Sequence, residues 1–142
     1  MTPRFRAWYT PFKGKTIGQE MKYGQAGRLI THAEMAPDKY VLMQSTGLKD
    51  KNGVEIFEGD VALITHKSTN YADTYWHSYV EVFRAKNGAY RIRGEHIYET
   101  ELYSNRKQLT VAGNIYNSPE LLKRDRFMTT TENPELSGDE QR

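Results

Sequence analysis

Four basic side chains surround the dipeptide Asn87-Gly88: Arg84 and Lys86 precede it, and Arg91 and Arg93 follow it. Asn and Gly accept positive φ at low cost, so this pair between two β-prone runs predicts a hairpin with a two-residue turn. In that register Lys86 faces Ala89 and Arg84 lies opposite Arg91. Because side chains alternate along a strand, all four basic residues would share one face of the hairpin.

The other face of this predicted hairpin is apolar, and we expect it to be the core side. It carries Phe83, Ala85, Tyr90 and Ile92. A loop of three residues, instead of two, would break this arrangement. Two interpretations of the basic face stay open. It is either a set of charges splayed into water, or a patch that binds the phosphates of a nucleic acid or an acidic protein surface.

Residues able to catalyse a reaction or hold a metal are scattered. The chain has no cysteine, and its histidines fit no compact ligand spacing: they are His32, His66, His77 and His96. Glu58 and Asp60 flank Gly59, a pattern more typical of carboxylates that bind local backbone N–H groups than of an acid–base pair. No glycine-rich phosphate loop is present. We therefore expect no enzyme activity, no catalytic residue, no metal and no cofactor.

The composition allows a modest core. The 142 residues suit one domain, or two small subdomains. Only 37% of the residues are hydrophobic, but ten Tyr, five Phe and two Trp supply large side chains for burial. The longest apolar runs are far too short to span a membrane, and the N-terminus leads into no signal-like segment. We expect a cytoplasmic protein with no membrane contact.

Charge is distributed unevenly along the chain. The net charge is +2, but residues 129–142 carry four acids and one base, a local charge of −3 that leaves +5 for residues 1–128. This final segment is polar and acidic, as disordered tails are. We predict one β-rich domain over residues 1–128, or two subdomains that meet near residues 37–40, followed by a disordered acidic tail over residues 129–142.

Short strands account for most of the remaining pattern. They are expected at residues 5–9, 29–32, 40–44, 54–57, 61–66, 75–84, 89–93 and 109–115. Thr46-Gly47 should interrupt the third of these, and residues 15–37 are otherwise weakly patterned. Ser118-Pro119 predicts a single helical turn over 120–124. This pattern favours a mainly β fold, with a small antiparallel, barrel-like curled sheet and one or two short helices.

A family resemblance lies in the central stretch TGLKDKNGVEIFEGD, residues 46–60. This stretch is similar to the signature of the YopX family, whose members occur mainly in phages and prophages. Two flanking blocks agree with it: Phe5-Arg6-Ala7-Trp8, and Gly113-Asn114-Ile115-Tyr116 followed by Ser118-Pro119-Glu120-Leu121-Leu122. The resemblance implies a β-rich, barrel-like fold and a phage setting. It supplies no catalytic residues.

Two functions follow from these observations. The first is a non-enzymatic, phage-encoded binding module that acts in the host cytoplasm on a nucleic acid or a nucleoprotein, through Arg84, Lys86, Arg91 and Arg93. The second is a protein–protein inhibitor or adaptor directed at a host factor. The basic hairpin face, the charge of +5, abundant tyrosine and the barrel-like fold support the first, since small barrels often present strand surfaces to single strands or to protein partners. Fold analogy alone is a weak argument for function.

The turn Asp50-Lys51-Asn52-Gly53 gives a first test. Replacing Gly53 with Val should lower the melting temperature, because a β-branched residue in a left-handed conformation is strained by about 1 kcal/mol or more. Thermal unfolding followed by circular dichroism measures this. Unchanged stability in Gly53→Val would contradict the predicted hairpin.

Overall fold

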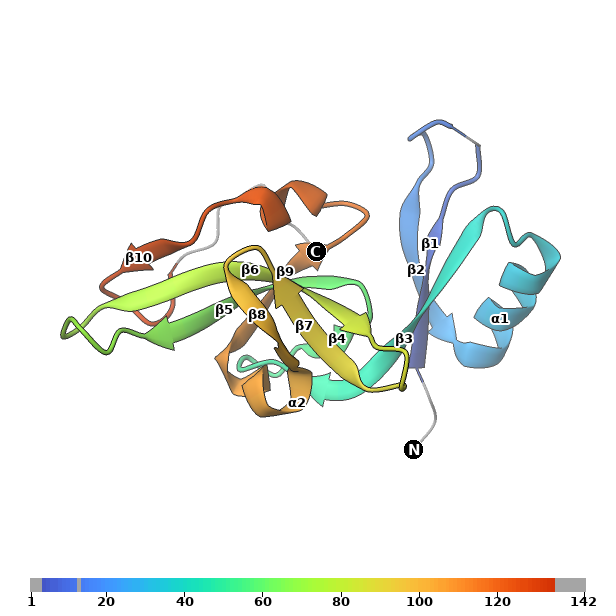
Figure 1. Ribbon diagram of the computed structural model, residues 1–142. Helices are drawn as coiled ribbons and strands as arrows, with labels where there is room; N and C mark the ends of the chain where they lie inside the picture. Colours follow the sequence, from blue (N-terminus) through green and yellow to red (C-terminus); the bar gives the residue numbers. More distant parts are fainter. Residues whose placement is uncertain (1–3, 13, 135–142) are drawn as a thin grey trace. The chain divides into compact units, whose positions relative to one another are not determined.

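Antiparallel strands dominate the computed structural model, which describes residues 4–12 and 14–134 (Figure 1). Contacts between Cα atoms divide the chain into two units, Met1–Gly47 and Leu48–Arg142. The division falls after Gly47, whereas the weak sequence pattern suggested residues 37–40. The described part of the chain contains no helix that is long and apolar enough to cross a membrane.

The first unit is a small sheet with one helix. Its elements are β1 (Arg4–Tyr9), β2 (Glu20–Gln25), α1 (Ala26–Met35) and β3 (Tyr40–Lys49). Strand β1 lies between β2 and β3 and is antiparallel to both. Ala7 on β1 and Leu29 on α1 are both buried, and α1 contacts β1 and β2. The unit therefore has its own small core.

Two sequence predictions in this unit are wrong. Residues 29–32 were expected as a strand, but they lie within α1. Leu29, Ile30 and Ala33 follow helical spacing, so one side of the helix can pack on the sheet. The interruption expected at Thr46-Gly47 is also absent, because β3 runs through Gly47 with a φ of +77°, a conformation that favours glycine.

The second unit holds the longer sheet and follows β3. Its strands are β4 (Glu55–Phe57), β5 (Asp60–Lys67), β6 (Tyr75–Arg84), β7 (Tyr90–Gly94), β8 (Ile97–Glu101), β9 (Leu109–Asn114) and β10 (Phe127–Thr129). Its short helices are α2 (Leu102–Asn105), η1 (Arg106–Gln108) and η2 (Pro119–Lys123). The larger sheet has the strand order β8-β7-β6-β5-β9, and β10 also pairs with β6.

Strand β5 is the centre of this unit because it is buried on both faces. Ala62 and Ile64 belong to one apolar cluster, together with Val82 and Ile92. Val61 and Leu63 belong to a second cluster on the opposite face, together with Tyr79, Ala112 and Leu121. The sheet curls around the first cluster, and Leu121 of η2 helps to cover the second. The predicted fold class is confirmed: the protein is mainly β, with a curled antiparallel half-barrel sheet and short helices.

The predicted turn at residues 50–53 is confirmed, and the Asp50 side chain organises it. Gly53 has a φ of +81°, and its N–H donates to the Asp50 carbonyl at 3.0 Å. The Asp50 carboxylate is almost buried and accepts from three backbone N–H groups: Asn52 at 2.8 Å, Val54 at 2.9 Å and Val111 at 2.9 Å. The last of these lies on β9, so one carboxylate ties the turn to the outer edge of the sheet.

The C-terminal part of the described chain is attached to β6. Thr129, where the acidic tail was expected to begin, ends strand β10 and pairs with Tyr75. Strand β10 lies beside β6 in Figure 1. Its Oγ1 contacts Nε2 of fully buried His77 at 2.7 Å. Residues 135–142 of the predicted tail lie outside the described residues.

Both ring nitrogens of His77 have hydroxyl partners. Thr129 Oγ1 donates to the Thr131 carbonyl at 2.6 Å, so it is an acceptor toward His77, while Thr65 Oγ1 lies 2.9 Å from Nδ1. This arrangement suits the neutral ring with its proton on Nε2. Burial, followed by the positive charge of Lys51, lowers the pKa of His77 from its ordinary value of 6.5, and a hydrogen bond to the Thr131 backbone partly opposes this shift.

Removing the Asp50 carboxylate should destabilise the protein strongly. Asp50→Ala leaves three backbone N–H groups without their acceptor, at a cost of about 1–3 kcal/mol for each group that stays unsatisfied. Urea unfolding should therefore show a loss of roughly 3 kcal/mol or more. Asp38→Ala, at an exposed position, is the matched control and should change stability by less than about 0.5 kcal/mol. Equal small effects in the two variants would contradict a central role for Asp50.

His77 should make stability depend on pH. Because its pKa is lowered in the folded state, the unfolded state binds the proton first as pH falls, so stability is complete above about 6.5 and decreases as pH falls through the folded-state pKa. The slope from one proton cannot exceed about 1.4 kcal/mol per pH unit. Urea unfolding at pH 7.5 and 5.5 should show a smaller pH effect in His77→Gln than in the parent. Exposed His66→Gln is the control and should keep the parent's profile. Identical profiles in all three proteins would exclude His77 as the source.

Candidate functional site

The β6–β7 hairpin has a three-residue loop, so its predicted register is wrong. Ala85 N–H donates to the Ala89 carbonyl at 2.8 Å, and Gly88 N–H donates to the Ala85 carbonyl at 2.9 Å. Gly88 has a φ of +89°, as the last residue of a three-residue hairpin loop usually does. Arg84 therefore pairs with Tyr90, and Phe83 pairs with Arg91.

Burial explains why the chain adopts this register. It places Val82 opposite Ile92, and both side chains are fully buried in the same cluster. The two-residue turn would have put Val82 opposite Arg93 instead. A shift of one residue exchanges the two faces of a strand, so the four predicted basic residues cannot all lie on one face.

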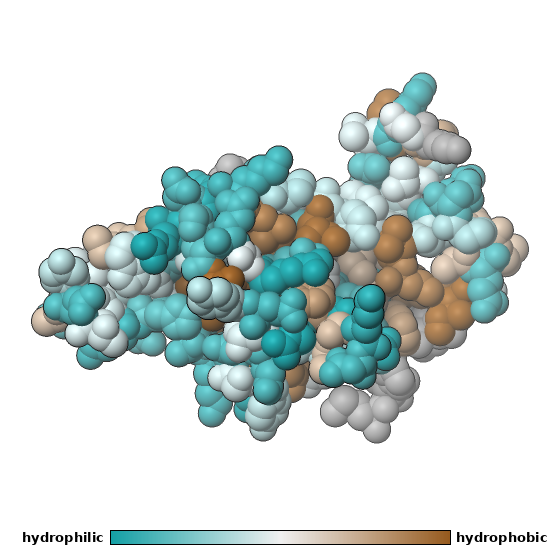
Figure 2. Space-filling view, in the orientation of Figure 1, coloured by the Kyte–Doolittle hydropathy of each residue, from teal (hydrophilic) through white to brown (hydrophobic). Residues whose placement is uncertain are grey.

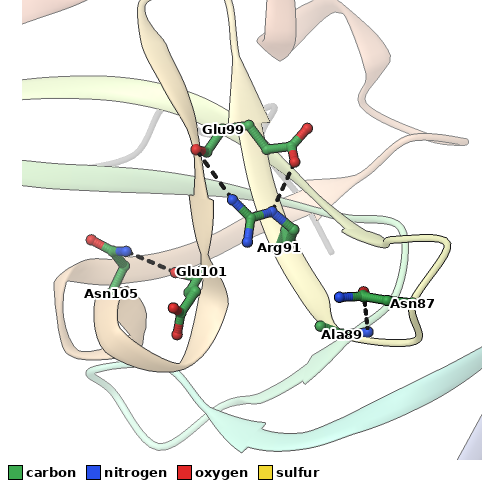
Figure 3. Close-up of polar contacts among 6 residues, drawn as sticks. All are labelled: Asn87, Ala89, Arg91, Glu99, Glu101 and Asn105. Atoms are coloured by element: carbon green, nitrogen blue, oxygen red, sulfur yellow. Dashed lines mark hydrogen bonds and ion pairs between the residues drawn. The ribbon is translucent and has the colours of Figure 1, made fainter.

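Arg91 and Arg93 lie on the face opposite the first apolar cluster, and each is balanced by a carboxylate. Arg91 Nε is 2.8 Å from Glu99 Oε2 (Figure 3), and Arg93 Nε is 3.3 Å from Glu81 Oε1. The Arg93 guanidinium also lies 4.0 Å from the centre of the Phe83 ring. Phe83 was expected on the core side, and the register places it under this arginine instead. Hydrophilic side chains cover most of β7 and β8 in Figure 2. This face is charge-balanced and does not form a basic patch.

Arg84 and Lys86 are different, because both are exposed at the end of the hairpin. Neither forms an ion pair with a carboxylate in the part of the chain that the structure describes. Of the four predicted binding residues, these two remain available to an external anion. Arg84 extends from the last position of β6, and Lys86 lies in the loop.

A groove of about 400 Å³ adjoins this end of the hairpin. Its lining residues are Leu48, Asn87, Ala89, Tyr90, Arg91, Glu101 and Tyr103. Figure 3 shows several of them around the start of β7 and the end of β8. The groove thus combines two aromatic rings with an arginine, a carboxylate and an amide, groups that suit binding through stacking and hydrogen bonds.

Cations stand beside both tyrosines of this groove. Arg84 pairs with Tyr90 across the hairpin, and the Arg106 guanidinium lies 3.9 Å from the centre of the Tyr103 ring. Burial, followed by the negative charge of Glu58, raises the pKa of Tyr90 from its ordinary value of 10.0, although Arg84 opposes this. The Tyr90 hydroxyl therefore stays protonated near neutral pH and can donate a hydrogen bond. We call the groove, together with Arg84, Lys86 and Arg106, the hairpin-end site.

Sequence reasoning missed Tyr103 and Arg106 because residues 95–107 gave no clear pattern. Both lie in adjoining short helices, where residues three apart come close together. An aromatic residue followed three positions later by an arginine was therefore the signal in the sequence that could have identified this pair. The groove itself joins segments far apart in the chain, which no local pattern reveals.

Asp60 and His77, two of the residues considered for chemistry, make structural hydrogen bonds. Asp60 is fully buried and its Oδ2 accepts from the Phe57 N–H at 2.8 Å. Among residues 4–12 and 14–134, no group of three or more His, Cys, Asp or Glu side chains is arranged to hold a metal ion.

Comparison with known proteins shows the family of this chain. The sequence model described as "YopX protein" matches residues 4–123. The chain belongs to the YopX family. A similar solved structure is the crystal structure of protein EF1440 from Enterococcus faecalis, which is 29% identical, with 86% of this chain and 99% of that chain covered and a TM-score of 0.48. A comparison with curated proteins finds no match.

The residues that carry the YopX resemblance support the fold. Asp50 and Asp60 bind backbone N–H groups, and the Asn114 side chain accepts from Tyr116 N–H at 2.9 Å. A Cβ at Gly113 would lie only 2.7 Å from Ser118 Oγ, so this position requires glycine. These YopX motifs therefore specify a scaffold, and the cations and tyrosines of the hairpin-end site lie outside them, although Leu48 of the central block also lines the groove.

Proposed function

We propose that this YopX-family protein is a non-enzymatic binding module that holds a nucleic acid, alone or within a nucleoprotein, at its hairpin-end site. The observation that carries the proposal is the position of Arg84 and Lys86. They are two exposed cations that form no ion pair with a carboxylate of the described residues, and they adjoin Tyr90 and Asn87 of a groove lined by two tyrosines. The family resemblance supports a phage-encoded protein that acts in the cytoplasm of the host cell.

Charge and ring chemistry together favour a nucleic acid over other anions. Phosphates provide the sequence-independent attraction to Lys and Arg, and bases provide flat surfaces that stack on aromatic rings. Arg91 and Arg93 contribute less to attraction because Glu99 and Glu81 already neutralise them. The proposal therefore assigns the phosphate contacts to Arg84, Lys86 and Arg106.

A second groove favours an alternative function, a protein–protein inhibitor or adaptor that targets a host factor. This groove, also of about 400 Å³, is lined by Glu81, Arg93, Gly94, Glu95, Pro119, Leu122 and Lys123. Its two acids and two bases balance, and Pro119 and Leu122 add apolar surface. Such a mixture suits a protein segment better than a polyanion.

Neutralising the two exposed cations tests the first function. In the full-length protein, Arg84→Gln with Lys86→Gln should weaken binding to a fluorescein-labelled oligonucleotide and lower the salt slope of log K by about 1.4, the value for two phosphate contacts to a single strand. Fluorescence anisotropy over a salt series measures both. Exposed charges contribute less than about 1 kcal/mol each to stability, so the variant should fold like the parent.

The matched control removes the same charge elsewhere. Lys15→Gln with Lys39→Gln changes two exposed lysines of the first unit and should keep the parent's salt slope. An equal loss in both double variants would show only a net-charge effect. If the parent shows no salt-sensitive binding, the nucleic-acid function is wrong. The alternative then gains support from a host-protein complex that survives nuclease treatment and is lost in Leu122→Asp.

A further inference from the structure

We infer that the hairpin-end groove accepts an unpaired base stacked on Tyr103, so that the ligand is a single-stranded rather than a double-stranded nucleic acid. This inference rests on the proposed function and specifies its ligand. The groove supplies a ring for stacking and groups that meet a base edge. Arg84 and Lys86 adjoin the lining residues Tyr90 and Asn87, where they can meet the flanking phosphates.

Tyr103 is an exposed ring on a fixed support. It is 60% exposed, although the preceding residue, Leu102, is fully buried in the core. Asn105 Nδ2 donates to the Glu101 carbonyl at 2.7 Å and closes the α2 turn on β8 (Figure 3). The Arg106 guanidinium stacks at 3.9 Å from the ring centre, and the ring also lines the groove. A tyrosine held in this way offers a preformed platform, which is how sequence-tolerant single-strand binders hold bases.

The polar groups of the groove complement the edge of a base. Asn87 Oδ1 accepts from the Ala89 N–H at 3.1 Å, which fixes the amide and leaves Nδ2 to donate outward (Figure 3). Glu101 supplies an acceptor and Arg91 a donor on the same lining. Donors and acceptors of this kind pair with the Watson–Crick edge, which is exposed only when the base is unpaired.

The same geometry disfavours a duplex. A two-stranded β-ribbon can enter the major groove of DNA and read bases with its exposed face. Here the exposed face of β7 and β8 carries Glu99 and Glu101, and Glu81 lies beside Arg93 on β6. Because these three carboxylates outnumber the two arginines, the closely spaced phosphates of a duplex would repel this face. A groove of about 400 Å³ also admits a single nucleotide more readily than a base pair.

The test compares two ligands and three tyrosine variants of the full-length protein. The ligands are a fluorescein-labelled twelve-nucleotide single strand of mixed sequence and the matching duplex, at one salt concentration. We expect the single strand to bind at least about ten-fold more tightly. Tyr103→Ala should weaken single-strand binding by about ten-fold, the scale of one lost stacking contact, while Tyr103→Phe should keep it. The salt slope should stay unchanged in both, because no cation is removed.

Tyr98→Ala is the matched control. Tyr98 is 95% exposed on neighbouring β8 and does not line the groove, so its removal should leave binding intact. Melting temperatures establish that each variant is folded. If the duplex binds as tightly as the single strand and depends equally on Arg84 and Lys86, the proposed function stands and this inference is wrong. Single-strand binding that is unaffected by Tyr103→Ala also overturns the inference, and a parent that binds neither ligand overturns both.

Discussion

The Asp50 carboxylate is the interaction on which the second unit depends. It accepts from two N–H groups of its own turn and from Val111 on β9, 61 residues later in the chain. Lys51 N–H adds a bond to the Leu109 carbonyl, 3.1 Å long. These contacts hold the turn after β3 against the outer edge of β9, and so they maintain the curl of the sheet around its apolar core. A nearly buried carboxylate can do this because each oxygen accepts more than one hydrogen bond.

Hydrogen bonds between side chains and the backbone also protect the opposite edge of the sheet. Strand β8 ends the strand order, and an open edge invites pairing with other chains. Its Glu99 carbonyl accepts from the Arg91 side chain, and its Glu101 carbonyl accepts from Asn105. Polar side chains thus engage both edge strands. Arg91 therefore has a structural task in addition to lining the groove, which explains why it contributes little free charge to the hairpin-end site.

Scaffold and site rest on largely different residues in this protein, and Leu48 belongs to both. The blocks that carry the YopX resemblance contain Asp50, Gly59, Asp60 and Gly113, and these close turns or accept backbone hydrogen bonds. Arg84, Lys86 and Tyr103 lie outside those blocks. The residues of these blocks thus support the curled sheet, while the proposed ligand site depends on side chains that the scaffold presents. The proposed function is argued from those side chains for this reason.

Local residue preferences in the sequence were sufficient to predict the fold class, the turn at residues 50–53 and the helical turn after Ser118-Pro119. Asp, Asn and Gly define the first of these turns, and Ser and Pro define the start of the second, through local backbone preferences that the sequence shows. Local preferences did not predict α1, because whether residues 29–32 form a helix or a strand depends on how Leu29 packs against the sheet.

The candidate site shows the same division. Lys86-Asn87-Gly88 suits both a two-residue and a three-residue hairpin loop, so the sequence identified the hairpin and its basic residues, but the predicted two-residue register was wrong. Only the tertiary structure decided it, because burying Val82 opposite Ile92 requires the longer loop. That one-residue difference separated Arg84 from Arg91 and Arg93. It also placed Tyr90 in the groove with Tyr103, a residue 13 positions away whose approach depends on the fold of β8 and α2.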